Sequence, residues 1–182
     1  MATATYRAQL WNVAVDQYGF ITTADAAGLD IPAVELRKLA KRGFLDHAGR
    51  GLYRFGDLPP TEFDHYMEAV LWAGRDAVVS HDAVLAMHDL AFANPSTIRV
   101  TTPHRVRKTR PRPDVTLVQA DLADDERTAY RGIPSTTVAR ALLDSRPLIM
   151  RSRLAEAADE ARRDGLLLAD EYEHVCQELR AR

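Results

Sequence analysis

The 182 residues are 46% hydrophobic and 27% charged, with a formal net charge of −2, a composition that is typical of a soluble globular protein and excludes a disordered chain. No apolar run approaches the ~20 residues that cross a bilayer, and the N-terminus lacks the basic and apolar regions of a signal peptide. The single cysteine, Cys176, excludes an internal disulfide and fits a reducing compartment. We therefore expect a cytoplasmic protein with no membrane segment.

Positive charge gathers in two parts of this nearly neutral chain. Residues 1–56 hold seven Lys and Arg against five Asp and Glu, whereas residues 57–182 hold 17 against 21. Within the second part, five cations fall in the short segment 104–112. The distribution indicates two local basic surfaces rather than a generally basic protein.

The N-terminal segment, 1–56, predicts three helices and a hairpin, in the order of a winged helix-turn-helix domain. A threonine hydroxyl at the start of the second helix and Pro32 in the first turn of the third are typical of helix starts. Gly28 and Gly43 follow the same two helices as C-terminal signals. The expected ranges are helices at 6–18, 22–27 and 32–42 and strands at 44–47 and 52–55.

The third predicted helix separates apolar and basic residues onto two faces. At 100° per residue, Leu36, Leu39 and Ala40 share the face that packs on a core. The other face carries Val34, which could meet a thymine methyl, and four cations: Arg37, Lys38, Lys41 and Arg42. Such a helix suits the major groove, because the flanking phosphates attract Lys and Arg and an arginine can pair bidentately with guanine.

The predicted hairpin adds Arg50 at its tip, with a glycine on each side, and Arg54 on its second strand. The glycines let the turn come close to a sugar-phosphate backbone. The alternative is that all these cations form only a solvated surface, although the order of the elements favours DNA. The residues predicted to contact DNA are Thr22, Thr23, Val34, Arg37, Lys38, Lys41, Arg42, Arg50 and Arg54.

Beyond the proline-containing linker at 56–60, residues 61–182 predict a mixed domain of helices around a small sheet, so the expected fold class is α+β. Ser80 is expected to cap a helix at 81–90, and residues 132–135 to lead into a helix at 137–144. Strands at 96–102 and 115–119 are expected to form a hairpin. The other expected helices are at 61–73, 148–163 and 169–179.

The second basic segment, at 104–112, is expected to be an extended loop or hairpin tip, because prolines and repelling charges disfavour a helix. It could hold DNA, meet an acidic face of a protein partner, or simply be solvated. Its cations are Arg105, Arg107, Lys108, Arg110 and Arg112.

No catalytic, metal or cofactor site is predicted. A nuclease core that begins at Pro113–Asp114 would need a lysine on the next strand, and no lysine follows Lys108. His81 and His88 share a helix face but have no third ligand at a recognisable spacing, and His174 with Cys176 is a weak metal signal. We therefore expect a protein that is not an enzyme.

Two segments resemble the AbiEi family of antitoxins, the transcription regulators of AbiE-type abortive-infection toxin–antitoxin pairs. The first segment is GFITTADAAGLDIPAVELRKLAKRGFLDHAGRGLYRF, which is similar to that family's N-terminal winged helix. The second runs from DAVVSHDAVLAMHDL through STIRVTTP to RGIPSTTVARALLD. Together they cover roughly residues 20–57 and 76–144.

The resemblance implies a repressor that binds an inverted repeat in the promoter of its own operon. It implies a neighbouring nucleotidyltransferase-like toxin and a C-terminal domain, 61–182, needed for antitoxin action of the type IV kind, with or without direct toxin binding. The family's DNA-contacting helix maps onto 32–42 and its wing onto 44–55. Two alternatives stay open: a stand-alone winged-helix regulator whose C-terminal domain senses a ligand or dimerises, and an antitoxin that acts only by protein interaction.

Overall fold

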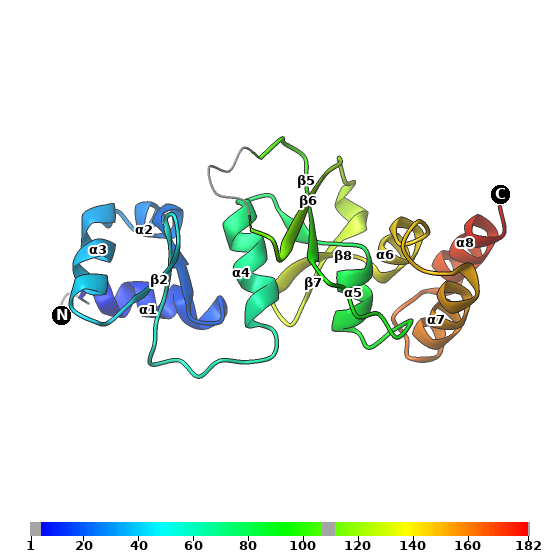
Figure 1. Cartoon of the computed structure of the whole chain (residues 1–182), viewed down its shortest axis with the longest axis horizontal. Helices are drawn as coiled ribbons and strands as arrows, with labels where there is room; N and C mark the ends of the chain where they lie inside the picture. The colour runs from blue at the N-terminus through cyan, green and yellow to red at the C-terminus, as the bar shows by residue number, and fades with distance from the viewer. Residues whose placement is uncertain (1–4, 107–111, 182) are drawn as a thin grey trace. The chain divides into compact units, whose positions relative to one another are not determined.

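The structure, a computed structural model, describes residues 5–106 and 112–181 (Figure 1). The chain divides into two compact units, Met1–Trp72 and Ala73–Arg182. The sequence places the domain boundary earlier, at the linker before residue 61. The helix that follows this linker, α4 (Asp64–Ala73), ends at the division and so falls in the first unit.

The first unit contains a winged helix-turn-helix. Its helices are α1 (Tyr6–Asp16), α2 (Thr23–Gly28) and α3 (Ala33–Lys41), and its strands are β1 (Phe20–Thr22), β2 (Asp46–Gly49) and β3 (Leu52–Arg54). The strands form an antiparallel sheet in the order β1-β3-β2. The sequence does not predict β1, because this strand is very short and its partner is distant in the sequence. It pairs with β3, which comes only after α2, α3 and β2.

Local chemistry explains where the short helices begin. The hydroxyl of Thr22 accepts a hydrogen bond from the N–H of Asp25, and the Asp25 carboxylate accepts one from the N–H of Thr22, which together form a capping box at the start of α2. α3 begins after Pro32, whose fixed φ suits the entry to a helix.

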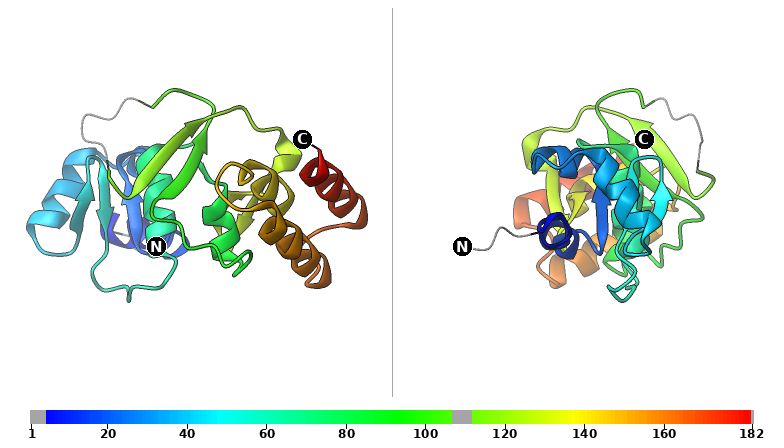
Figure 2. Two further views of the ribbon diagram at one scale, coloured as in Figure 1. Left: turned by 45° about the vertical axis from the view of Figure 1, so that its right-hand side comes forward. Right: turned by 90° about the vertical axis from the view of Figure 1, so that its left-hand side faces the viewer.

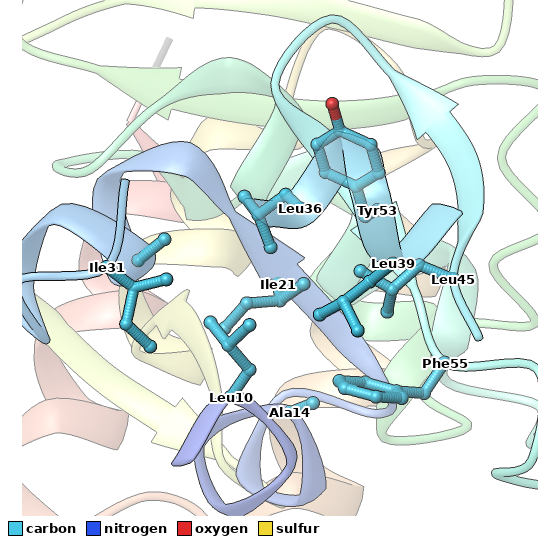
Figure 3. Close-up of a cluster of buried hydrophobic side chains, with 10 residues drawn as sticks. Leu10, Ala14, Ile21, Ile31, Leu36, Leu39, Leu45, Tyr53 and Phe55 are labelled. Atoms are coloured by element: carbon cyan, nitrogen blue, oxygen red, sulfur yellow. The ribbon is translucent and has the colours of Figure 1, made fainter. Parts of the chain in front are cut away.

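One apolar core holds the winged helix together (Figure 3). α1 contributes Leu10 and Ala14, β1 contributes Ile21, and α3 contributes Leu36 and Leu39, all of them buried. The ring of Trp11 packs edge-on against Phe55, with 5.1 Å between the ring centroids. The helices and strands of the winged helix thereby share one interior, which fixes how α3 and the hairpin lie relative to each other.

The second unit contains a five-stranded mixed sheet in the order β6-β5-β4-β8-β7. The strands are β4 (Val78–Val79), β5 (Ile98–Thr102), β6 (Val115–Gln119), β7 (Arg127–Tyr130) and β8 (Ile133–Thr136). The helices are α5 (Asp82–Met87), α6 (Val138–Asp144), α7 (Arg151–Arg163) and α8 (Ala169–Arg180), with a 3₁₀ turn, η1, at Asp124–Glu126. In both Figure 1 and Figure 2, α7 and α8 lie side by side.

One expectation for the strands of this unit is wrong, and the strand β8 is not predicted by the sequence. β5 and β6 pair in parallel, with Ile98 opposite Val115, so they are not a hairpin. A parallel pair needs a connection of about a dozen residues or more, and the segment between these strands is about that long. Residues 132–135 lead into a helix as expected, since α6 follows them, but residues 133–136 also form β8, which pairs with β7 on one side and with β4 at Val79 on the other. In the described residues, no helix is long and apolar enough to cross a membrane.

Candidate nucleic-acid interface

α3 presents its cations to solvent, as the helical arithmetic predicts. Leu36 is fully buried and Leu39 is 7% exposed, whereas Val34 is 41% exposed. The four basic side chains of this helix region are likewise exposed: Arg37, Lys38, Lys41 and Arg42. Because burial of the leucines fixes the rotation of the helix about its axis, the basic face cannot turn inward without opening the core.

The four cations of α3 are not equivalent. Lys38 Nζ lies 2.7 Å from the carboxylate of Glu35, one turn earlier on the helix. Among the described residues, Arg37, Lys41 and Arg42 form no ion pair. A phosphate that approaches Lys38 has to compete with Glu35, so the other three cations offer the stronger attraction.

Arg54 has a structural position that the sequence does not predict. Its guanidinium donates to the carboxylate of Asp64 at 2.8 Å and to the carbonyl of Leu58 at 3.1 Å, and it lies over the ring of Phe20. Only 18% of its side chain is exposed. Arg54 therefore ties β3 to the linker and to the start of α4, whereas the sequence predicts a DNA contact for it.

The wing is the short hairpin of β2 and β3, joined by Arg50 and Gly51. Arg50 is exposed at its tip. The turn lies against the start of α2, because the N–H of Thr23 donates to the carbonyl of Gly51 at 2.9 Å. Sequence reasoning identified Thr23 and Arg50 separately, but nothing in the sequence showed that they meet.

Thr22 and Thr23 have different roles. The hydroxyl of Thr22 donates to Asp25 Oδ2 at 2.6 Å and accepts from the N–H of Asp25, so both its functions serve the cap of α2. In the part of the chain that the structure describes, the Thr23 hydroxyl has no hydrogen-bond partner. Of the two predicted threonines, Thr23 is the one that can donate to a ligand.

The second basic segment is only partly described. Arg105 is exposed, whereas Arg112 donates from Nε to Asp114 at 3.1 Å, and this contact lowers the pKa of the Asp114 carboxyl. Arg107, Lys108 and Arg110 lie outside the described residues. The segment connects the parallel strands β5 and β6 rather than the arms of a hairpin.

Two partly buried arginines of the second unit are paired with acids. Arg99 donates to both carboxylate oxygens of Asp82 at 2.8 Å. Arg140 donates from Nε to both oxygens of Asp144 at 2.9 Å and from a terminal nitrogen to Glu126 at 2.7 Å. The guanidinium of Arg140 lowers the pKa of Glu126. Glu126 thereby joins the acidic turn at 124–126 to α6.

Buried hydroxyls cross the middle of this sheet. The hydroxyl of Thr101 donates to Ser80 Oγ at 2.7 Å, and Ser80 Oγ lies 2.9 Å from Nδ1 of His81. Ser80 therefore does not cap the following helix as expected, since α5 has no side-chain cap. His81 has φ 58° and ψ −142°, which is unusual for a residue other than glycine. Its burial, between the ion pairs of Arg99 and Arg140, lowers its pKa.

The described residues contain no group of three or more His, Cys, Asp or Glu side chains placed to hold a metal ion. His88 stacks on Tyr130, with 4.1 Å between the ring centroids, and burial lowers its pKa. His81 is hydrogen-bonded to Ser80 instead. Each histidine that sequence reasoning weighed on this helix face thus has a structural neighbour.

A comparison with curated protein sequences gave no match. Among solved structures, the chain is similar to the Rv2827c protein from Mycobacterium tuberculosis, with 16% identity over 97% of this chain and 72% of that chain and a TM-score of 0.49. Residues 10–56 match the family described as transcriptional regulator, AbiEi antitoxin.

The matched segment begins at Leu10 in α1 and ends just after β3, so it contains α2, α3 and the whole wing. The family is one of transcription regulators that serve as antitoxins. Its winged helix is followed here by the mixed unit of helices and strands. Over residues 10–56, the chain is therefore similar to the AbiEi antitoxin family of transcriptional regulators.

Proposed function

We propose that this protein is a DNA-binding antitoxin that represses its own operon. The observation that carries the proposal is the face of α3, where Arg37, Lys41 and Arg42 are exposed beside Val34 with no ion pair among the described residues. The family match over residues 10–56 supports a regulator with DNA and a toxin as partners in general. The specific partners are an inverted repeat in its promoter and a nucleotidyltransferase-like toxin encoded beside it.

The mechanism of binding follows from the geometry of the first unit. α3 enters the major groove, where Val34 and Arg37, one turn apart at the start of the helix, face the base edges. Lys41 and Arg42 follow at its C-terminal end and neutralise phosphates at the rim of the groove. The wing places Arg50 on the adjoining backbone.

The test is binding of the purified protein to its own upstream DNA, measured over a range of salt concentrations. In the variant Arg37→Ala/Lys41→Ala/Arg42→Ala, we expect affinity at low salt to fall at least ~100-fold and the slope of log K against log salt to flatten by about 2 to 3 units. The matched control is Arg151→Ala/Arg153→Ala/Arg163→Ala, which removes the same charge from exposed positions of α7 in the second unit. Equal losses in both variants would contradict a specific α3 interface.

Antitoxin action is tested by co-expression with the product of the adjoining gene, scoring growth rescue and complex formation together. Rescue by the full chain, with no rescue by residues 1–72, assigns neutralisation to the second unit. Type IV action predicts rescue without a stable complex. Repression is scored separately with a reporter under the upstream promoter, and loss of repression in the α3 variant with retained rescue separates the two activities.

A further inference from the structure

The contact between the wing and α2 has a consequence for how DNA is held. The N–H of Thr23 donates to the carbonyl of Gly51, and a Cβ added to Gly51 would lie 2.9 Å from the Thr23 hydroxyl oxygen. The wing turn therefore rests directly on the Thr23 side chain. Because Arg50 immediately precedes Gly51 in the chain, this contact anchors its backbone next to Thr23.

The Thr23 hydroxyl is suited to bind a ligand. It is half-buried, it has no hydrogen-bond partner among the described residues, and it lies at the first position of α2. The neighbouring Asp25 carboxylate does not compete for it, because Asp25 Oδ2 already accepts from both the N–H and the hydroxyl of Thr22. A threonine hydroxyl and an arginine are both common donors to DNA phosphates.

We propose that Thr23 and Arg50 bind the same DNA phosphate, with the Thr23–Gly51 contact setting the distance between them. This inference rests on the proposed DNA binding and goes beyond it, because it makes the wing tip and the start of α2 one phosphate clamp instead of two independent contacts. The hydroxyl of Thr23 donates to one phosphate oxygen, and the guanidinium of Arg50 donates to another and supplies the charge.

The clamp predicts distinct effects for its two members. Arg50→Ala removes a charge, so it lowers affinity about tenfold and flattens the salt slope by about 0.9. Thr23→Val keeps the shape and the backbone N–H but removes the hydroxyl, so it lowers affinity about three- to tenfold and leaves the salt slope unchanged. Because the α2 cap belongs to Thr22 and Asp25, the unfolding midpoint of Thr23→Val stays close to that of the wild type.

The experiment is a double-mutant cycle on the full chain, with the upstream duplex and an unrelated duplex as probes. For Thr23→Val/Arg50→Ala, we expect a loss at least threefold smaller than the product of the two single losses, because either variant alone already disrupts the shared site. The control cycle, Thr23→Val/Arg42→Ala, involves Arg42 on α3 and should be multiplicative.

The outcomes separate this inference from the proposed function. If the α3 triple variant loses binding while the Thr23/Arg50 cycle is multiplicative like its control, the clamp is wrong and the DNA function stands. Wild-type affinity in Thr23→Val also overturns the clamp. If the wild-type protein binds neither duplex at any salt concentration, the proposed function and the clamp both fail.

Discussion

The arginines of the α3 region and two ion-paired arginines of the second unit occupy opposite environments. On α3, Arg37 and Arg42 are exposed and have no ion pair among the described residues, whereas Arg99 and Arg140 of the second unit are partly buried against carboxylates. The same side chain is therefore exposed to solvent at Arg37 and Arg42, without an acidic partner in the described part of the chain, and gives internal cohesion at Arg99 and Arg140. Formal charge alone would not distinguish them, since what differs is whether an acid lies within reach.

The two interiors differ in the same way. The winged helix packs around an apolar cluster, with its polar groups at caps and on the surface. The second unit buries Ser80, Thr101, Ser135 and Thr136 within its sheet. The hydroxyls of Thr101 and Ser80 are hydrogen-bonded to each other, whereas Ser135 Oγ and Thr136 Oγ1 have no hydrogen-bond partner among the described residues. The second unit therefore depends more on how its polar groups are paired.

Arg140→Ala should destabilise the second unit by about 2–3 kcal/mol, because it leaves Asp144 and Glu126 close together without their shared cation. Arg37→Ala should change stability by less than ~0.5 kcal/mol. Both tryptophans, Trp11 and Trp72, lie in the first unit, so tryptophan fluorescence follows that unit, whereas far-UV circular dichroism follows both. Arg140→Ala should shift only the transition that fluorescence does not report.

Gly51→Ala should cost the first unit about 2 kcal/mol, and Gly43→Ala about 1 kcal/mol. Both glycines have positive φ, +72° and +80°, so both variants introduce backbone strain. Only at Gly51 does the new Cβ also meet another group, the Thr23 hydroxyl, whereas nothing lies within 4 Å at Gly43. The difference between the two unfolding free energies, measured by tryptophan fluorescence, isolates the wing contact, and equal values would contradict it.

Acidification from pH 7 to 5 should destabilise the second unit. Burial lowers the pKa of both His81 and His88, so the unfolded chain takes up protons below about pH 6.5 while the folded unit still resists them. Stability therefore falls as pH drops through this window. The double variant His81→Asn/His88→Gln should flatten the dependence, and an unchanged slope would show that other groups cause it. The lowered pKa of Glu126 affects stability at more acidic pH. The stabilisation that comes from its hydrogen bond with Arg140 is lost only as the pH falls through the pKa of Glu126 in the folded protein.

The smallest effect should distinguish two lysines on α3. Lys41→Ala should weaken DNA binding about fivefold, and Lys38→Ala should weaken it less, because Glu35 already offsets the charge of Lys38. In a Glu35→Ala background, the loss from Lys38→Ala should rise toward that from Lys41→Ala. Fluorescence anisotropy at low salt can measure both, and identical single losses would contradict a role for Glu35.

Much of the first unit could be predicted from its sequence, because its signals are local. Helical periodicity placed Leu36 and Leu39 inside and the cations of α3 outside, and a threonine, a proline and two glycines marked the helix ends. The match over residues 10–56 falls on this same segment. A helix face depends only on neighbours three and four positions away, which a sequence displays directly.

Tertiary structure decided the rest. It paired β5 with β6 in parallel, formed the strand β8 in the residues that lead into α6, and placed Arg54, a predicted DNA contact, in an ion pair with Asp64. It also brought Thr23 into contact with Gly51, although α3 and β2 separate the two residues in the sequence. Strand direction and the partner of an arginine depend on groups far away in the sequence. The sequence by itself therefore determined which residues form the basic face of α3, and only the folded chain decided which of the predicted cations are exposed and which have an acidic partner.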